Sequence, residues 1–218
     1  MLPFSIHKSN THQKTKIMKA REIIRTEEGI RLVKETFSSE LIRALDLIPV
    51  SSPLIVAHKS GINDDLNGTE RPVRFPVRGF NGQEAEVVQS LAKWKRLRLM
   101  ELEMPIGKGI LTDMRALRPD EETGPLHSVY VDQWDWEKHI SPEERTLETL
   151  RTAVRLIYGA LRTTGQKVAE ELKMPAPDLP ESISFIHADE LLKRYPGLTP
   201  GERETEATRA HGAIFLTG

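Results

Sequence analysis

The segment ALRPDEETGPLHSVYVDQWDWE, from Ala116 to Glu137, indicates which fold the chain adopts. It belongs to two runs rich in β-forming residues, 110–118 and 128–136, which flank a stretch that contains prolines, an aspartate and a glycine. Such runs on either side of turn-forming residues are typical of a β-hairpin. We therefore predict an antiparallel hairpin in the middle of the chain.

The second predicted strand has one polar and one aromatic face. Side chains two residues apart in a strand share a face, so Gln133 and Asp135 point one way while Trp134 and Trp136 point the other way. The alternation therefore predicts that the polar pair and the tryptophans lie in different surroundings.

The loop of the hairpin carries Arg118, Asp120 and Glu121. A guanidinium can bind two phosphate oxygens, and carboxylates bind cationic amines. The loop and the polar face are therefore a candidate site for a phosphate and an amine. A salt-linked hairpin with a solvated face would have the same periodicity, and it stays an alternative explanation from these residues alone.

A second segment, EVVQSLAKWKR, runs from Glu86 to Arg96. It reads as a strand that leads into a helix over 91–102, with Ser90 as the N-cap. Lys95 then lies near the first turns, where its ammonium can meet a carboxylate. The alternative is an ordinary solvated lysine among its basic neighbours.

The remaining elements alternate between helices and strands. Apolar residues at helical spacing predict a helix before a strand that contains Pro53, and their stripe consists of Ile30, Val33, Phe37, Leu41 and Leu45. A second helix is predicted to start with a cap at Ser141–Glu144 and to bury Leu147, Leu150, Val154, Ile157 and Leu161. Strands at 184–187 and 213–216 and helices near 190–194 and after Pro200 complete an α+β fold.

Composition restricts the classes of function. The chain has 218 residues, a formal net charge of −1 and no cysteine. The length fits one domain, which we place at 18–218, after a polar extension over 1–17 that we expect to be disordered. The charge balance gives no reason to expect a nucleic-acid partner, no apolar run approaches a membrane span, and we expect a cytoplasmic protein. Without cysteine there is no thiol nucleophile and no thiol-dependent release of ammonia from glutamine.

The stretches QSLAKWKR, ALRPDE and LHSVYVDQWDWE resemble the ammonia-dependent asparagine synthetases, or aspartate-ammonia ligases. The likeness extends from about Ile30 to the last residue. It implies the catalytic fold of class II aminoacyl-tRNA synthetases, an antiparallel sheet flanked by helices, and a homodimer that uses the first long helix and the strand after it.

The resemblance also implies roles for single residues. Arg118 matches the arginine that acts on the α-phosphate of ATP, and Glu121, or less closely Asp120, matches the acid that contacts adenine. The residues implied to bind or orient the substrates are Ser90, Lys95, Gln133, Asp135, which would meet the α-ammonium of aspartate, and Asp64, the loop acid for ammonia. With Arg118, Asp64 and Asp135 form the implied catalytic set.

The implied reaction forms asparagine from aspartate, ammonia and ATP through a β-aspartyl adenylate, with Mg²⁺ bound to ATP. No metal ligand is expected within this chain, because AIFLTG ends before the family's acidic metal-binding residues and its third motif. The fold is therefore expected to be incomplete at its C-terminal end. The alternative function is an inactive, shortened homologue that binds aspartate or acts as a dimerising interaction protein.

Overall fold

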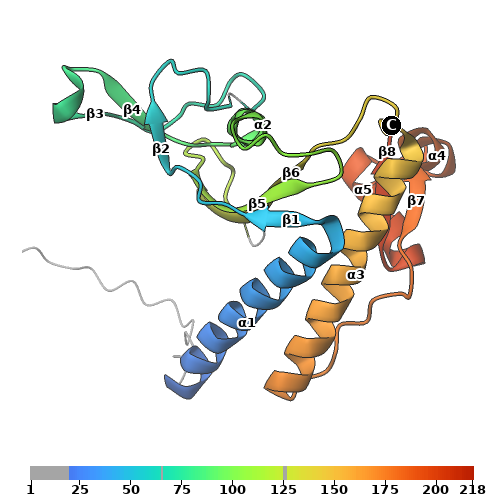
Figure 1. Cartoon of the computed structure of the whole chain (residues 1–218). Helices are drawn as coiled ribbons and strands as arrows, with labels where there is room; N and C mark the ends of the chain where they lie inside the picture. The colour runs from blue at the N-terminus through green and yellow to red at the C-terminus, as the bar shows by residue number, and fades with distance from the viewer. Residues whose placement is uncertain (1–19, 65, 125–126) are drawn as a thin grey trace, which may run out of the picture.

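The computed structural model describes residues 20–64, 66–124 and 127–218 of the chain (Figure 1). The expected extension at 1–17 lies outside the described residues. The fold has both helices and strands, which confirms the α+β class. None of the described helices combines the length and the apolar character that crossing a bilayer requires.

Two long helices lie side by side (Figure 1). They are α1 (Ala20–Leu45) and α3 (Leu147–Leu172). Helix α1 buries Phe37, Leu41 and Leu45, as the stripe predicted, whereas Ile30 is exposed. Helix α1 ends at Leu45 because the next residue, Asp46, takes a left-handed φ of 56°.

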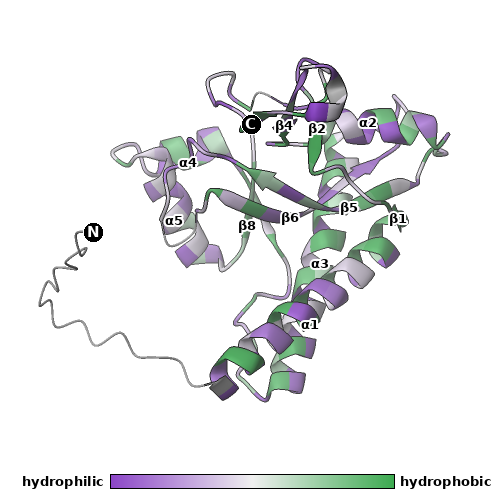
Figure 2. Ribbon diagram, turned by 90° about the vertical axis from the view of Figure 1, so that its left-hand side faces the viewer, coloured by the Kyte–Doolittle hydropathy of each residue, from purple (hydrophilic) through white to green (hydrophobic). Residues whose placement is uncertain are grey.

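The predicted start of α3 was wrong. Ser141 and Glu144 do exchange the two hydrogen bonds of a capping box, at 2.8 and 3.3 Å, but they form a single turn and the helix begins at Leu147. Thr146 is the N-cap, and its hydroxyl accepts from the Thr149 amide at 3.2 Å. Of the predicted stripe, Val154 is buried and Ile157 packs against the core, while Leu147, Leu150 and Leu161 are exposed. Figure 2 shows hydrophobic and hydrophilic residues interspersed along both long helices.

The predicted hairpin is the centre of a three-stranded sheet. Its strands are β5 (Gly109–Leu117) and β6 (Tyr130–Lys138), which pair antiparallel, and β1 (Leu47–Pro49) lies beside β5. The β1–β5 pair is parallel, so this sheet is mixed, whereas the resemblance implied an antiparallel sheet. Strand β6 also extends to Lys138, which places Gln133 and Asp135 within the strand and not at its end.

Gly109 lets these three strands meet. A Cβ at this position would lie 2.3 Å from the Glu137 carbonyl oxygen and 2.7 Å from a methyl group of Leu47. Any larger residue would therefore push β1 or β6 away from β5. The aromatic face of β6 then packs on α1: the rings of Phe37 and Trp134 meet edge to face at 4.8 Å, and the Trp134 indole N–H donates to Ser38 Oγ at 2.9 Å.

Two smaller sheets flank this centre. Strands β2 (Ile55–Ala57), β4 (Glu84–Val87) and β3 (Arg74–Pro76) form an antiparallel sheet in the order β2-β4-β3, and the short 3₁₀ helix η1 (Arg78–Phe80) connects β3 and β4. Helix α2 (Ala92–Glu101) follows β4 and contacts β5 and β6. Strands β7 (Ser184–His187) and β8 (Ile214–Thr217) form a parallel pair. The helices α4 (Ala188–Arg194) and α5 (Pro200–His211) connect them along the chain.

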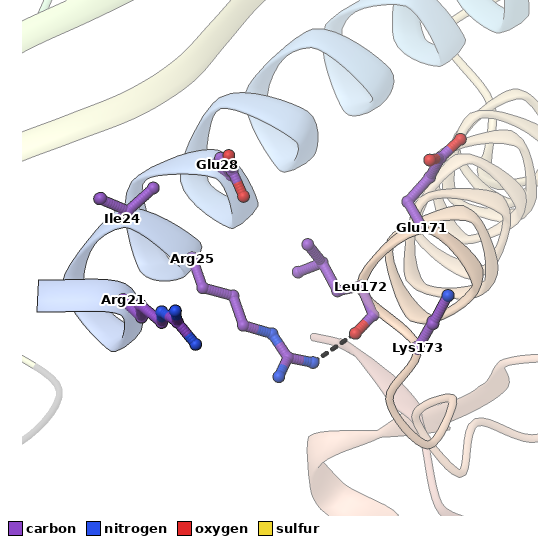
Figure 3. A pocket seen from close by; sticks show the side chains of 7 residues that line it. All are labelled: Arg21, Ile24, Arg25, Glu28, Glu171, Leu172 and Lys173. Carbon is purple, nitrogen blue, oxygen red and sulfur yellow. Dashed lines mark hydrogen bonds between the residues drawn. The ribbon is translucent and has the colours of Figure 1, made fainter. Parts of the chain in front are cut away.

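The free ends of the two long helices are joined by a side chain. The Arg25 guanidinium donates to the carbonyl oxygen of Leu172, at the C-terminal end of α3 (Figure 3). Arg21 and Lys173 lie around the same shallow hollow. Because the last carbonyls of a helix lack intrahelical donors, Arg25 stabilises the end of α3 and ties it to α1.

Candidate functional site

One face of the β5–β6 hairpin carries most of the residues singled out from the sequence. In the observed register Thr112 pairs with Asp135 and Met114 pairs with Gln133, so these four side chains share a face. Helix α2 contacts both strands of the hairpin. The opposite face carries Trp134 and Trp136, which pack toward α1. The predicted separation of polar and aromatic residues is therefore confirmed.

Lys95 is buried between α2 and β6. Its ammonium donates to Asp135 Oδ1 and, at 3.0 Å, to the carbonyl oxygen of Trp136, and Glu137 lies 3.8 Å away. Only 5% of the residue is exposed, so the alternative of a solvated lysine is wrong. A buried ammonium requires such partners, because desolvation would otherwise favour its neutral form. The second carboxylate oxygen of Asp135 accepts no hydrogen bond from the described residues, and it is the atom left for a ligand.

Ser90 is not the N-cap of α2, which corrects the prediction. The N-cap is Leu91, whose side chain makes no capping hydrogen bond. The Ser90 hydroxyl donates to Asp64 Oδ2 at 3.1 Å, and its oxygen accepts from the Ala92 amide, in the first turn of α2, at 3.4 Å. Lys93 reaches the other oxygen of Asp64 at 3.2 Å. The structure therefore joins two predicted site residues that are distant in sequence.

Arg118 follows directly after β5. Its guanidinium donates to the backbone carbonyl of Gln89 through Nε and one Nη, at 3.4 and 3.3 Å. These bonds are long, and the other Nη has no partner among the described residues. A guanidinium has five N–H donors in a planar fork, so Arg118 keeps donors for a ligand while Gln89 orients it.

The two acids of the loop differ in what they contact. Asp120 is paired with Arg71, whose backbone amide donates to Asp120 Oδ2 at 2.8 Å and whose guanidinium also binds the carboxylate. The hydrogen bond from the Arg71 side chain, and then that from its backbone, lower the pKa of Asp120 to about 2. Glu121 has no side-chain partner within the described part of the chain. Of the two acids, Glu121 is the one whose carboxylate is available to a ligand.

The candidate residues form two groups joined by the hairpin. Asp64, Ser90 and Arg118 meet around Gln89, and Lys95 meets Asp135 further along the hairpin. Gln133 lies between these groups on the same face, and its side chain has no hydrogen bond to the described residues.

Three further residues lie in this region, and the sequence analysis assigns a site role to none of them. Gln89 is 1% exposed, and its side-chain Nε2 has no hydrogen-bond partner in the described structure. Thr112, opposite Asp135, likewise has a buried and unpaired Oγ1. Buried polar atoms are nearly always paired, so two unpaired ones beside this face point to a ligand-binding region. The third is Arg71, the partner of Asp120. The alternation along β5 points to Thr112 only once the register of the hairpin is known, because that register places Thr112 opposite Asp135.

The described residues contain no group of three or more histidine, aspartate or glutamate side chains that could hold a metal ion. Asp64 and Asp135 are each engaged by a lysine. The residues described therefore do not fit a protein-bound Mg²⁺, and we assign no step to one.

Comparison with known sequences identifies close relatives. A family profile described as aspartate-ammonia ligase matches residues 24–218. An aspartate–ammonia ligase of Parabacteroides distasonis is 50% identical over 193 residues, which cover 88% of this chain and 56% of that protein. A Fusobacterium nucleatum protein of the same name is 50% identical over 195 residues, which cover 89% of this chain and 59% of that protein. The chain thus spans little more than half the length of these relatives.

Comparison with solved structures gives the fold. Asparaginyl-tRNA synthetase of Pyrococcus horikoshii, complexed with asparaginyl-adenylate, has a TM-score of 0.55 at 17% identity, over 91% of this chain and 46% of that one. The Entamoeba histolytica enzyme, also with asparaginyl-adenylate, has a TM-score of 0.52 at 16% identity, over 97% and 48%. At such low identity the likeness shows the fold alone, which is that of class II aminoacyl-tRNA synthetases.

Proposed function

The chain belongs to the aspartate-ammonia ligase family, and on that basis we propose that the protein makes asparagine from aspartate, ammonia and ATP, with release of AMP and pyrophosphate. One observation of the structure carries this proposal: the ion pair of Lys95 and Asp135 and the cluster of Asp64, Ser90 and Arg118 lie along one side of a single hairpin. These groups can bind the substrates of the reaction. A cation binds a phosphate of ATP, a carboxylate binds the ammonium group of aspartate, and a lysine binds a carboxylate of aspartate.

In the first step, a β-carboxylate oxygen of aspartate attacks the α-phosphorus of ATP. The bond from that phosphorus to the bridging oxygen breaks, and pyrophosphate leaves with the electron pair. Negative charge builds on the α-phosphate oxygens, where the free donors of Arg118 stabilise it. The reaction is accelerated because the protein holds the reactants in position and stabilises the charge on the phosphate. No covalent enzyme intermediate is therefore needed.

In the second step, ammonia attacks the carbonyl carbon of the β-aspartyl adenylate. The bond from carbon to the phosphate oxygen breaks, so AMP leaves with one oxygen that began in aspartate. We assign to Asp64 the role of holding and orienting ammonia, and to Ser90 that of fixing the Asp64 carboxylate. The 3.1 Å hydrogen bond between Ser90 and Asp64 supports both assignments.

The remaining residues bind the substrates. Asp135, through its unengaged oxygen, meets the α-ammonium of aspartate, while Lys95 and Gln133 contact its polar groups. We propose that Glu121 and not Asp120 contacts adenine, because Arg71 already holds Asp120. ATP brings its own Mg²⁺ as part of the substrate, and that ion would neutralise phosphate charge.

Three broader assignments belong to the same proposal. We place one domain at 18–218: α1 contacts α3, and Arg155 of α3 lies 5.4 Å from the centre of the Phe185 ring in β7. The protein acts in the cytoplasm, where ATP and aspartate are available. It forms a homodimer, a state that exposed apolar residues on β1, on β2 and just before it (Ile48, Leu54 and Ile55) support. Light scattering that gives twice the 24.7 kDa of one chain is the expected result.

The two half-reactions can be tested separately. Aspartate-dependent exchange of labelled pyrophosphate into ATP, without ammonium, reports the first step. Ammonium-dependent formation of AMP and asparagine in equal amounts reports both steps. A folded protein that shows neither would contradict the proposal and would favour the alternative of an inactive, interacting homologue.

A further inference from the structure

Asn63 precedes Asp64 in the loop between β2 and β3, and its side chain is buried, with 7% of the residue exposed. Its Nδ2 donates to the Val87 carbonyl oxygen at 3.2 Å, and its Oδ1 accepts from the Gln89 amide at 2.8 Å. Residues 87 and 89 are two apart in an extended segment, so their backbone groups point the same way. The Asn63 amide thus takes the place that a neighbouring strand would occupy.

These two bonds lie at the junction of the candidate site. Next to Gln89, the Ser90 hydroxyl binds Asp64, and the Gln89 carbonyl accepts from the Arg118 guanidinium. The backbone of Gln89 therefore contacts both groups: its amide donates to Asn63 of the loop, and its carbonyl oxygen accepts from Arg118. Within the described part of the loop, Asn63 is the residue whose side chain bonds to the backbone of both Val87 and Gln89.

The loop has further contacts at Ile62, which packs against the buried cluster that contains Val88, and at Asp64, which pairs with Lys93 at 3.2 Å. Gly61, Leu66 and Gly68 have positive φ angles of 75°, 51° and 86°, and the residues around them are mostly exposed. Such a segment samples many conformations unless specific bonds fix it. The Asn63 amide supplies the loop's side-chain hydrogen bonds to the backbone of Val87 and Gln89, and Asp64 adds a hydrogen bond to Ser90.

We infer that Asn63 is a positioning residue, whose side-chain amide docks the Asp64 loop on the end of β4 and so sets Asp64 relative to Arg118. Only an amide of this length supplies both a donor to Val87 and an acceptor to Gln89. Aspartate would keep the acceptor and lose the donor, and alanine would lose both. The consequence for catalysis rests on the proposed function; the docking itself does not.

The docking can be measured without any activity, by hydrogen exchange of backbone amides in the folded protein. The Gln89 amide is protected by Asn63 in the native protein. In Asn63→Ala we expect its exchange to speed up about tenfold or more, and in Asn63→Asp we expect protection to persist. Amides of the β5–β6 ladder, such as Met114, serve as the internal reference. Unchanged Gln89 protection in Asn63→Ala would overturn the inference.

The catalytic consequence is measured on the two half-reactions. Asn63→Ala should raise the KM for ammonium about tenfold, whereas aspartate-dependent pyrophosphate exchange should change by less than about threefold. Asn67→Ala is the matched control, since Asn67 belongs to the same loop but its side chain binds only Glu70 at the surface. It should leave both rates unchanged.

Two other outcomes have distinct meanings. If both half-reactions fall equally in Asn63→Ala, together with the melting temperature, Asn63 supports the fold alone and the positioning role is overturned. If the unmodified protein catalyses neither step, the proposed function fails, and Gln89 exchange still decides whether Asn63 docks the loop.

Discussion

At the scale of single residues, the proposed function makes Arg118 the residue on which adenylation should depend most. It is the guanidinium of the site with unengaged donors, and Gln89 holds it at the end of β5. We expect Arg118→Ala to lower aspartate-dependent pyrophosphate exchange about 10²- to 10³-fold, the usual cost of removing one donor that stabilises transition-state charge. Arg115→Ala, which removes an exposed arginine of β5, is the control and should keep full exchange. Equal rates in both variants would remove Arg118 from the mechanism.

Lys95 contributes both to the site and to the fold. Removing one partner of a buried ion pair leaves an uncompensated charge, so Lys95→Met should lower the free energy of unfolding by about 3–5 kcal/mol. The double variant Lys95→Met with Asp135→Asn should recover much of that loss in urea titrations, yet stay inactive. An active double variant would show that this ion pair has only a structural role.

Asp120 and Glu121 are adjacent acids with different expected effects. Glu121→Gln should raise the KM for ATP, while Asp120→Asn should not. Because the folded pKa of Asp120, about 2, lies below its unfolded value near 3.9, its ion pair with Arg71 is fully formed above that value and is lost as the pH falls through about 2. In Arg71→Ala, carboxyl NMR titration should show the pKa of Asp120 return toward its ordinary value. A larger ATP effect at Asp120 would reverse the assignment.

The sequence predicted individual residues where the rule was local. Alternation along β6 separated Gln133 and Asp135 from the tryptophans, and the structure agrees. Ser90 was predicted as a helix cap because only its neighbours in sequence were considered. Its actual partner, Asp64, is 26 residues away, and that contact depends on how the loop folds back on β4.

At the scale of elements, α1 is fixed to the hairpin by Lys34. Its ammonium donates to both Asp132 oxygens at 2.9 Å, on the face of β6 that packs toward α1. This hydrogen bond raises the pKa of Lys34 above its ordinary value of 10.5, against the opposing effect of partial burial. The stabilisation is therefore fully present below about pH 10.5 and is lost as the pH rises through the raised value.

Lys34→Met tests this contact. The variant should be less stable than the native protein in urea at pH 7 to 9, and the difference should narrow above pH 10.5, where the native lysine also loses its charge. Arg31→Met, which removes an exposed pair within the same helix, is the control. A difference that does not depend on pH would mean that lost packing, and not the charge, causes the effect.

Element boundaries were predictable only where a local signal was strong. The strand at 184–187 has the predicted bounds, and the capping box of α5 agrees with a helix that starts at Pro200. The start of α3 differs from the prediction because Ser141–Glu144 and Thr146 both form cap hydrogen bonds, and the helix follows the second of them. Strand pairing had no local signal: β1 and β5 are far apart in sequence, and their parallel contact needs Gly109.

At the scale of the whole molecule, the chain belongs to a recognised family, and its fold brings the candidate site residues together from separate segments. The fold places a carboxylate paired with lysine, a forked cation and a docked acidic loop along one hairpin, although these groups come from three separate segments. The sequence motifs identified the family, while the distances between the groups followed only from the folded chain. The central claim is that the β-carboxylate of aspartate becomes bonded to the α-phosphate of ATP.

Oxygen transfer tests that claim most directly. The protein is incubated with ATP, ammonium and aspartate that carries ¹⁸O in its β-carboxylate, and the AMP is examined by mass spectrometry. Because the adenylate breaks between carbon and oxygen, we predict that AMP gains one ¹⁸O atom for each asparagine formed. Asparagine formed together with unlabelled AMP would contradict the account, since the carboxylate oxygen would then never have bonded to phosphorus.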